Sequence, residues 1–210
     1  MSSIERIQCG NGNCYLISER EKAILVDTSR TKFRDKILQA CKKKHVKLIV
    51  LTHGHVDHVQ NAAYLSRELH VPIAMHEADY ELIKDNMFEP MYAHNVFGKL
   101  ILALSMKSFR QDKIEPFEPG VFLQEGDSLK LYGINAVIVE LPGHTKGSIG
   151  ILVDDTEFIV GDALMNMVYP SKSMLYGDRV AMEKSVDKIS DSNAITIHFG
   201  HGNSAANRKW

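Results

Sequence analysis

The chain has 210 residues, a length typical of one globular domain or of one domain with an insertion. Its 25 Lys and Arg nearly balance 26 Asp and Glu, so the composition gives no general attraction to nucleic acid or to anionic membranes. No apolar run approaches the length of a membrane helix, and no basic segment followed by an apolar core opens the chain. We therefore expect a single domain over residues 1–210 of a cytoplasmic protein with no nucleic-acid or membrane partner. Cys9, Cys14 and Cys41 lack metal-type spacing and are expected to be reduced thiols.

The first half of the chain alternates short apolar runs with segments of helical spacing. Residues 4–8 and 13–17 are predicted as strands around a Gly-Asn-Gly turn, and residues 23–26 form a second buried run. A helix is predicted over 31–44, with Phe33, Ile37, Leu38 and Cys41 facing inward. Asp27 follows the run 23–26, where it either caps the next segment or supports a metal-ligand loop through a hydrogen bond.

The segment Thr52-His53-Gly54-His55-Val56-Asp57-His58 places four metal-capable side chains within six positions. It follows the apolar run 48–51, which is predicted as a buried strand, and precedes a segment with helical spacing. In an extended segment residues two apart point the same way, so His53 and His55 can grip one metal ion together. Asp57 and His58, where the chain begins to coil, can turn toward a second point. Imidazole and carboxylate groups are ligands that zinc and iron accept.

The stretch 84–120 interrupts the regular alternation. It is rich in methionine and aromatic residues and contains the apolar segment 100–106. We expect a helical insertion here, which either packs over the edge of the domain or forms a lid over an apolar substrate, because methionine adapts to varied shapes. His94 lies in this stretch, as a surface residue or as a substrate contact.

Strand character returns after residue 121. Leu129-Lys130-Leu131 alternates, residues 136–141 form a strong strand, and 149–153 and 157–160 are predicted as a hairpin. A helix is predicted over 178–189 and a final strand over 194–197. These strands run into Pro142-Gly143-His144, Gly161-Asp162 and the segment that contains His198 and His201.

Five strand ends, after residues 26, 51, 141, 160 and 197, thus carry Asp or His. If the strands lie in two packed sheets, these ends can converge on one edge. That edge would collect His53, His55, Asp57, His58, His144, Asp162 and His201. Seven ligands are too many for one tetrahedral zinc with an open position, and they suit two metal ions roughly 3.5–4 Å apart.

These motifs resemble those of the metallo-β-lactamase superfamily, in the family's order and over nearly the whole chain. The resemblance implies an αββα sandwich of the α+β class, with two mixed β-sheets packed face to face and helices outside. By this resemblance His53, His55 and His144 would hold the first metal ion, and Asp57, His58 and His201 the second. Asp162 would bridge the two ions. The family pattern ends in Gly-His-Gly, which favours His201 over His198 as the last ligand.

The chain departs from the family pattern at two positions. Ser29 stands where a glycine is common after Asp-Thr, and Phe199 stands where a proline often precedes Gly-His. Neither departure removes a ligand.

The resemblance also narrows the function. An Asp at position 162 argues against a β-lactamase, and His55 argues against the flavo-diiron relatives, which carry Glu there. What remains resembles small glyoxalase II-like hydrolases. We expect two divalent ions, zinc first and iron or manganese as alternatives, whose bridging hydroxide attacks an ester, thioester or lactone carbonyl of a small-molecule substrate. Asp57 would orient that hydroxide as a catalytic residue. A mononuclear iron enzyme resembling the persulfide dioxygenases and a phosphodiesterase are the alternatives, and a homodimer is left open.

Overall fold

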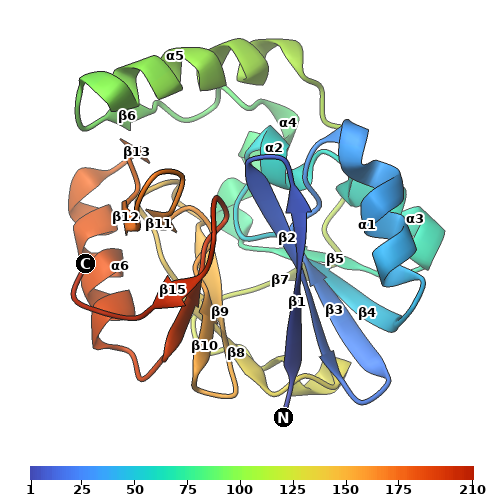
Figure 1. Ribbon diagram of the computed structural model, residues 1–210. Helices are drawn as coiled ribbons and strands as arrows, with labels where there is room; N and C mark the ends of the chain where they lie inside the picture. Colours follow the sequence, from blue (N-terminus) through green and yellow to red (C-terminus); the bar gives the residue numbers. More distant parts are fainter.

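The computed structural model describes all 210 residues and arranges them as two facing β-sheets with helices on both outer sides (Figure 1). The first sheet has six strands in the order β1-β2-β3-β4-β5-β7. β2 is antiparallel to both of its neighbours, β1 and β3, whereas β3, β4, β5 and β7 run parallel. The strands are β1 Ser3–Cys9, β2 Gly12–Glu19, β3 Lys22–Val26, β4 His45–Val50, β5 Ile73–Met75 and β7 Val121–Phe122.

The second sheet has five strands in the order β15-β14-β10-β9-β8. It is also mixed, because β10 and β14 are parallel while the other neighbours are antiparallel. Its strands are β8 Ala136–Glu140, β9 Ile149–Val153, β10 Glu157–Ile159, β14 Thr196–His198 and β15 Ala205–Ala206. Two short ribbons, β11 with β12 and β6 with β13, complete the strands. They comprise Tyr92–Ala93 (β6), Leu164–Met165 (β11), Ser171–Lys172 (β12) and Leu175–Tyr176 (β13).

The molecule has four layers, two outer layers of helices and two inner sheets, and a cluster of buried apolar side chains lies between each pair of neighbouring layers. One lies between the first sheet and the helices α1 and α3, one between the two sheets, and one between the second sheet and α6. The alternation of β3 shows how the clusters are filled: Leu25 faces α1, while Ile24 and Val26 face the second sheet. Because both faces of β3 are covered, its sequence is a continuous apolar run. The predicted αββα sandwich with two mixed sheets is confirmed.

The helices lie mostly where helical spacing predicts them, with shifted bounds. The stretch 31–44 begins as a 3-10 turn before α1, and its buried residues include Ile37, Leu38 and Cys41, as expected. The segment after the His motif divides into two helices, α2 and α3. The helices are α1 Arg34–Cys41, α2 Val56–Val59, α3 Ala62–Leu69, α4 Tyr80–Lys84, α5 Val96–Gln111 and α6 Arg179–Asp191, with 3-10 turns η1 Thr31–Phe33, η2 Glu77–Asp79 and η3 Leu129–Tyr132. No helix has both the length and the apolar character needed to cross a membrane.

The alternation Leu129-Lys130-Leu131 does not form a strand, and this prediction is wrong. The residues form the 3-10 helix η3, in which the Ser128 hydroxyl accepts a hydrogen bond from the Lys130 amide. Gly133 ends the turn in the left-handed conformation, with φ +85°. A local capping interaction at each end has therefore overridden a period-two pattern only three residues long.

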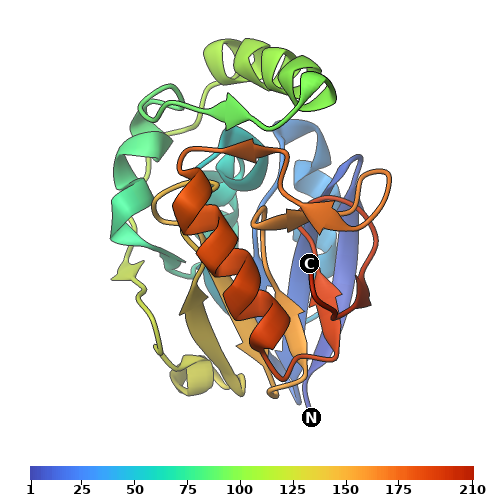
Figure 2. The ribbon, with the colours of Figure 1, turned by 90° about the vertical axis from the view of Figure 1, so that its left-hand side faces the viewer.

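Helix α5 crosses the end of the sandwich and spans both halves of the molecule (Figures 1 and 2). Only Gly98 and Phe109 of its 16 residues are buried, so little apolar burial holds it in place. Instead it is fixed by polar contacts at its two ends. At the first end the His94 amide donates a hydrogen bond to the Met174 carbonyl, and Asn95 caps the helix by accepting one from the Gly98 amide. At the other end Arg30 donates to the Ser108 hydroxyl and forms an ion pair with Asp112.

We predict that Arg30→Ala loosens the C-terminal half of α5. The loss of the ion pair to Asp112 and the hydrogen bond to Ser108, both partly exposed to solvent, should accelerate hydrogen exchange of the α5 amides roughly threefold to tenfold, which corresponds to about 1 kcal/mol. The measurement is hydrogen–deuterium exchange resolved by peptide, with Arg110→Ala, on the exposed surface of the same helix, as the control. Unchanged exchange in Arg30→Ala, or equal acceleration in the control, would contradict the role of this contact.

Candidate metal centre

The seven side chains expected as ligands lie at one edge of the sandwich, where strands of both sheets end. The ends of β3 and β4 meet there because the two strands are parallel, and β10 and β14 meet there for the same reason. The seven are His53 and His55 in the loop after β4, Asp57 and His58 in α2, His144 after β8, Asp162 after β10 and His201 after β14.

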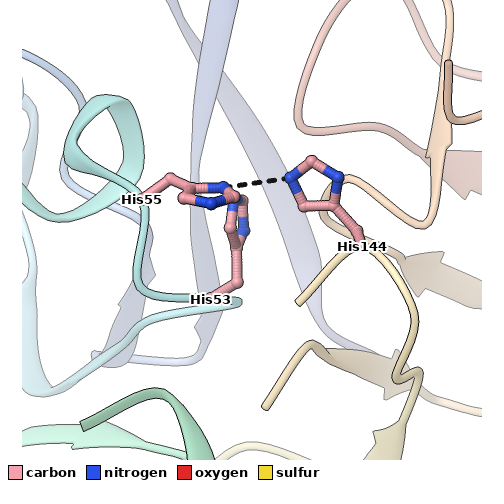
Figure 3. Close-up of side chains that lie close together, drawn as sticks. All are labelled: His53, His55 and His144. Atoms are coloured by element: carbon pink, nitrogen blue, oxygen red, sulfur yellow. Dashed lines mark hydrogen bonds between the residues drawn. The ribbon is translucent and has the colours of Figure 1, made fainter. Parts of the chain in front are cut away.

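The seven side chains divide into three overlapping groups, and in each group the ligand atoms lie within 4.8 Å of one another. His53, His55 and His144 form the first group, in which the three imidazoles converge from two loops (Figure 3). The other groups are His53, His58 and Asp162, and Asp57, His58 and His201. The structure therefore brings all the predicted ligands together.

The distances between ligand atoms suit a cation at their centre. Two ligand atoms of a tetrahedral zinc, each ~2.0–2.1 Å from the ion, lie roughly 3.3 Å apart. His55 Nδ1 lies 3.1 Å from His144 Nε2, and His201 Nε2 lies 3.2 Å from Asp162 Oδ2. His58 Nε2 is 3.6 Å from Asp162 Oδ1, and His144 Nε2 is 3.7 Å from Asp162 Oδ2. Asp162 thus touches both halves of the cluster.

Two atoms of the cluster are buried without a hydrogen-bond partner, His53 Nε2 and Asp162 Oδ1. A buried polar atom left unpaired costs roughly 1–3 kcal/mol, so such atoms are rare in folded proteins. Both atoms belong to residues whose ligand atoms converge with those of their neighbours. A bound metal ion would satisfy both atoms, and the set of imidazoles and carboxylates therefore fits a metal centre.

Asp27 orients two parts of the ligand loop. Its carboxylate accepts hydrogen bonds from the amide and the hydroxyl of Thr52, both at 2.8 Å, and lies 2.8 Å from His58 Nδ1. The Thr52 hydroxyl also lies 3.1 Å from His53 Nδ1. Of the two roles left open for Asp27, support of the metal-ligand loop is the one the structure shows. These contacts turn the Nε2 atoms of His53 and His58 toward the cluster.

Backbone carbonyls orient two more imidazoles. His144 Nδ1 lies 3.0 Å from the Leu175 carbonyl oxygen, and His201 Nδ1 lies 3.1 Å from that of Asn11. Each contact commits Nδ1 as a donor and leaves Nε2 free to act as a ligand.

Burial keeps the first group neutral. It lowers the pKa of His53 well below the ordinary value and, together with the neighbouring His144, lowers the pKa of His55 to about 3. The pKa of His144 is also lowered, chiefly by burial. Neutral imidazoles present lone pairs, which metal binding requires.

The pKa values of Asp162, His58 and His201 are shifted by their charges on one another. Burial opposes ionisation of Asp162, but His201 and His58 hold the pKa of its carboxyl well below the usual range. Burial likewise opposes the charged form of His58, but Asp162 and Asp27 raise its pKa to about 10. The pKa of His201 is raised too, against burial, by Asp162. A cation that binds these two imidazoles therefore competes with protons for them.

The two departures from the family pattern are both accommodated. Ser29 has φ +53°, in the left-handed region that favours glycine, which gives a physical reason for the glycine common there. Phe199 is fully buried and packs edge-on against Trp210, with ring centroids 5.8 Å apart. Gly200 cannot be replaced by a residue with a side chain without displacing Asp162, because a Cβ there would lie 2.2 Å from Asp162 Oδ1.

Two other histidines near strand ends lie outside the cluster. His198, the rival of His201, is bonded on both nitrogens, with Nε2 2.8 Å from Glu157 and Nδ1 2.8 Å from Ser204. His76 accepts a hydrogen bond from the Ala78 amide and contacts Glu140. Their nitrogens are thus occupied by protein partners away from the cluster.

Asp79 is a site residue that sequence reasoning missed. It is fully buried, and its carboxylate accepts hydrogen bonds from the Gly54 amide, the Gly147 amide and the Thr145 hydroxyl. It therefore ties the loop of His53 and His55 to the loop of His144. Burial raises the pKa of Asp79 to about 6, against these hydrogen bonds. Its only signal in the sequence is that of an acidic residue shortly after strand β5.

The cluster opens into a cavity of about 400 Å³, which we call the metal cavity. Helix α5 forms one wall through Ile101, Leu104, Ser105, Ser108 and Phe109. The Phe109 ring stacks on the His55 imidazole, with centroids 4.7 Å apart and planes at 19°. A substrate in this cavity would therefore lie between the ligand loops and α5.

Comparison with known proteins agrees with this geometry. The family model of the metallo-beta-lactamase superfamily matches residues 7–201. The hydroxyacylglutathione hydrolase GloC of Haemophilus influenzae is 31% identical over 198 residues, which cover 90% of this chain and 85% of that protein.

Two solved structures share the fold. The BLEG-1 B3 metallo-beta-lactamase has a TM-score of 0.74 at 19% identity, over 99% of this chain and 95% of that one. The protein TTHA1623, solved in a di-iron-bound form, has a TM-score of 0.71 at 22% identity, over 97% of this chain and 94% of that one.

The family match runs from the first strand to His201, the last side chain of the cluster, and so includes every residue that the geometry brings together. The chain belongs to the metallo-beta-lactamase superfamily.

Proposed function

We propose that the protein is a dinuclear metal-dependent hydrolase of an ester, thioester or lactone. The observation that carries this proposal is the position of Asp162 between two sets of ligands. His144 Nε2, from the first set, and His201 Nε2, from the second, lie 3.7 Å and 3.2 Å from the same carboxylate oxygen. One carboxylate shared by two such sets favours two adjacent ions over one.

The residues divide between two ions as the resemblance implies. His53, His55 and His144 would hold the first, Asp57, His58 and His201 the second, and Asp162 both. Two divalent ions, zinc first, would supply a water of near-neutral pKa and a Lewis acid for the carbonyl. The protein supplies the fixed directions of the ligands and the wall of α5, which limits access of bulk water.

Asp57 has a position suited to orienting the attacking water. It faces the metal cavity, and its Oδ2 lies 3.7 Å from His201 Nε2 and 3.9 Å from Arg30. Burial opposes its ionisation, but His58 and His201 lower the pKa of its carboxyl. An ionised carboxylate at this point can accept a hydrogen bond from the water and align it with the carbonyl.

The overall reaction is acyl transfer to water. The water oxygen forms a new bond to the acyl carbon, and the bond from that carbon to the leaving oxygen or sulfur breaks. The leaving group takes one proton as an alcohol or thiol, and the carboxylic acid releases the other. The name of GloC denotes release of a hydroxyacyl group from glutathione by hydrolysis, and this relative supports the same reaction class here.

We predict about two zinc ions per chain in protein purified without chelator, and hydrolysis of at least one probe in a panel of a short ester, a thioester and a lactone. Elemental analysis and a pH-stat assay measure the two quantities. Asp162→Ala is the matched variant and should lose second-ion binding and at least ~100-fold in turnover while remaining folded. About one iron per chain with oxygen consumption, or cleavage of a phosphodiester but of no acyl probe, would refute the proposal.

We predict that His201→Ala loses one metal ion per chain and that His198→Ala keeps both. His201 belongs to the group with Asp57 and His58, whereas both nitrogens of His198 contact Glu157 and Ser204. The test is elemental analysis of both variants after dialysis against metal-free buffer. Loss of an ion from His198→Ala but not from His201→Ala would make His198 the metal ligand in place of His201.

We predict that Asp79→Asn weakens metal binding by His53, His55 and His144. An amide nitrogen would face a backbone N–H where the carboxylate now accepts a hydrogen bond, and the free energy of unfolding should fall by about 1–3 kcal/mol. Metal competition with a chelating dye and denaturant unfolding measure the two effects. Glu77→Gln makes the same chemical change on an exposed side chain two residues away and should alter neither quantity. Equal metal affinity in Asp79→Asn and the wild type would show that Asp79 does not position the ligand loops.

A further inference from the structure

A second cavity, of about 610 Å³, opens beside the metal cavity. Its lining comes from the first turn of α5, the β11–β12 ribbon and the segment that leads into β13. We call it the apolar cavity, because most of its lining is apolar or aromatic. These side chains are Phe97, Met165, Met167, Val168, Tyr169 and Met174.

The apolar cavity adjoins the metal cavity. Met165 and Met167 line both, and Met165 lies only three residues after Asp162. Helix α5 also spans the two: Phe97 lines the apolar cavity, while Ile101 and Leu104 line the metal cavity. These positions are four and seven residues apart, so they lie on one face of the helix. One helical face thus forms a shared wall from the apolar cavity to the ligands.

Apart from His94 and the Tyr169 hydroxyl, the polar side chains around the apolar cavity are bonded within the protein. Asn95 accepts a hydrogen bond from the Gly98 amide, and the hydroxyls of Ser171 and Ser173 donate to backbone carbonyls. Lys172 forms an ion pair with Glu183. The cavity therefore offers an occupant much apolar surface and few free hydrogen-bonding groups.

The apolar lining is open to solvent. Phe97 is 51% exposed, Val168 75% and Tyr169 69%. Adjacent large apolar side chains left open in this way mark a binding surface more often than a structural one. Methionine side chains such as Met165 and Met167 adapt to flexible apolar ligands.

We propose that the apolar cavity binds a hydrocarbon arm of the substrate while the scissile carbonyl lies in the metal cavity. This inference rests on the proposed function and names the substrate class for the same site, an ester, thioester or lactone with a medium-length alkyl chain. The volume falls in the range of small-molecule sites. Each methylene group removed from water there should raise kcat/KM roughly twofold to fourfold.

The test measures kcat/KM of the zinc-loaded enzyme on two series of thioesters. In one series the acyl group grows from acetyl to octanoyl on a fixed small thiol, and in the other the thiol grows from ethyl to octyl on a fixed acetyl group. We expect a rise of at least roughly 50-fold across one of the series, which also shows whether the arm belongs to the acyl or the leaving group. Phe97→Gln and Val168→Gln, whose side chains line only the apolar cavity, should flatten that rise.

Leu131→Gln is the matched control. Leu131 is 83% exposed, in η3 at the end of the molecule opposite α5, and its substitution should leave the rise unchanged (Figure 2). Hydrolysis of the short probes with no rise in either series would overturn the inference and leave the proposed function standing. The same rise in the wild type and in both cavity variants would also overturn it. Absence of any acyl hydrolysis would refute the proposed function and the inference with it.

Discussion

The main physical constraint on this structure is the free-energy cost of removing five imidazoles and two carboxylates from water at one site. Polar groups removed from water are stable only when paired. Here pairing comes partly from the groups themselves, since Asp162 lies beside His58, His144 and His201. It also comes from a frame of fixed hydrogen bonds, in which Asp27 and Asp79 each tie separate stretches of backbone together. The atoms that remain unpaired, His53 Nε2 and Asp162 Oδ1, lie where a cation would complete the balance.

The family resemblance implied the sandwich, and the recurrence of Asp and His at strand ends indicated that the seven side chains could gather at one edge. Apolar runs such as 23–26 and 48–51 have no polar face, so both sides of each strand must be covered. Parallel pairing then carries the ends of β3 and β4 to one edge, and the pairing of β10 with β14 does the same in the second sheet. The pairing of the strands therefore places the residue that follows each strand at the edge where the site lies.

Features that depend on long-range contacts were not predictable in the same way. Asp79 is recognised only by its partners Gly54 and Gly147, which lie 25 and 68 residues away in sequence. The sequence leaves Asp27 two roles, as a cap or as a support of the ligand loop, and its contact with His58 distinguishes them. The turn at 129–131 was decided by the capping hydroxyl of Ser128 and by Gly133, against a short alternation. The position of α5 rests on Arg30, Ser108 and Asp112, and no local pattern links these residues.

The weak attachment of α5 and the openness of the apolar cavity have a common physical origin. A helix with two buried residues out of 16 contributes little to the core, so its inward face is free to serve as a cavity wall instead. Phe109 at one end stacks on the ligand His55, and Phe97 near the other end faces the apolar cavity. A substrate that fills both cavities would bury the apolar side of α5 that the protein leaves exposed. Substrate binding and the ordering of α5 would then be coupled, because the substrate would cover the apolar face of α5 and α5 would cover the apolar part of the substrate. Discrimination between substrates would consequently reside in this helix and in Met165 and Met167, whereas the ligand loops beneath supply the chemistry.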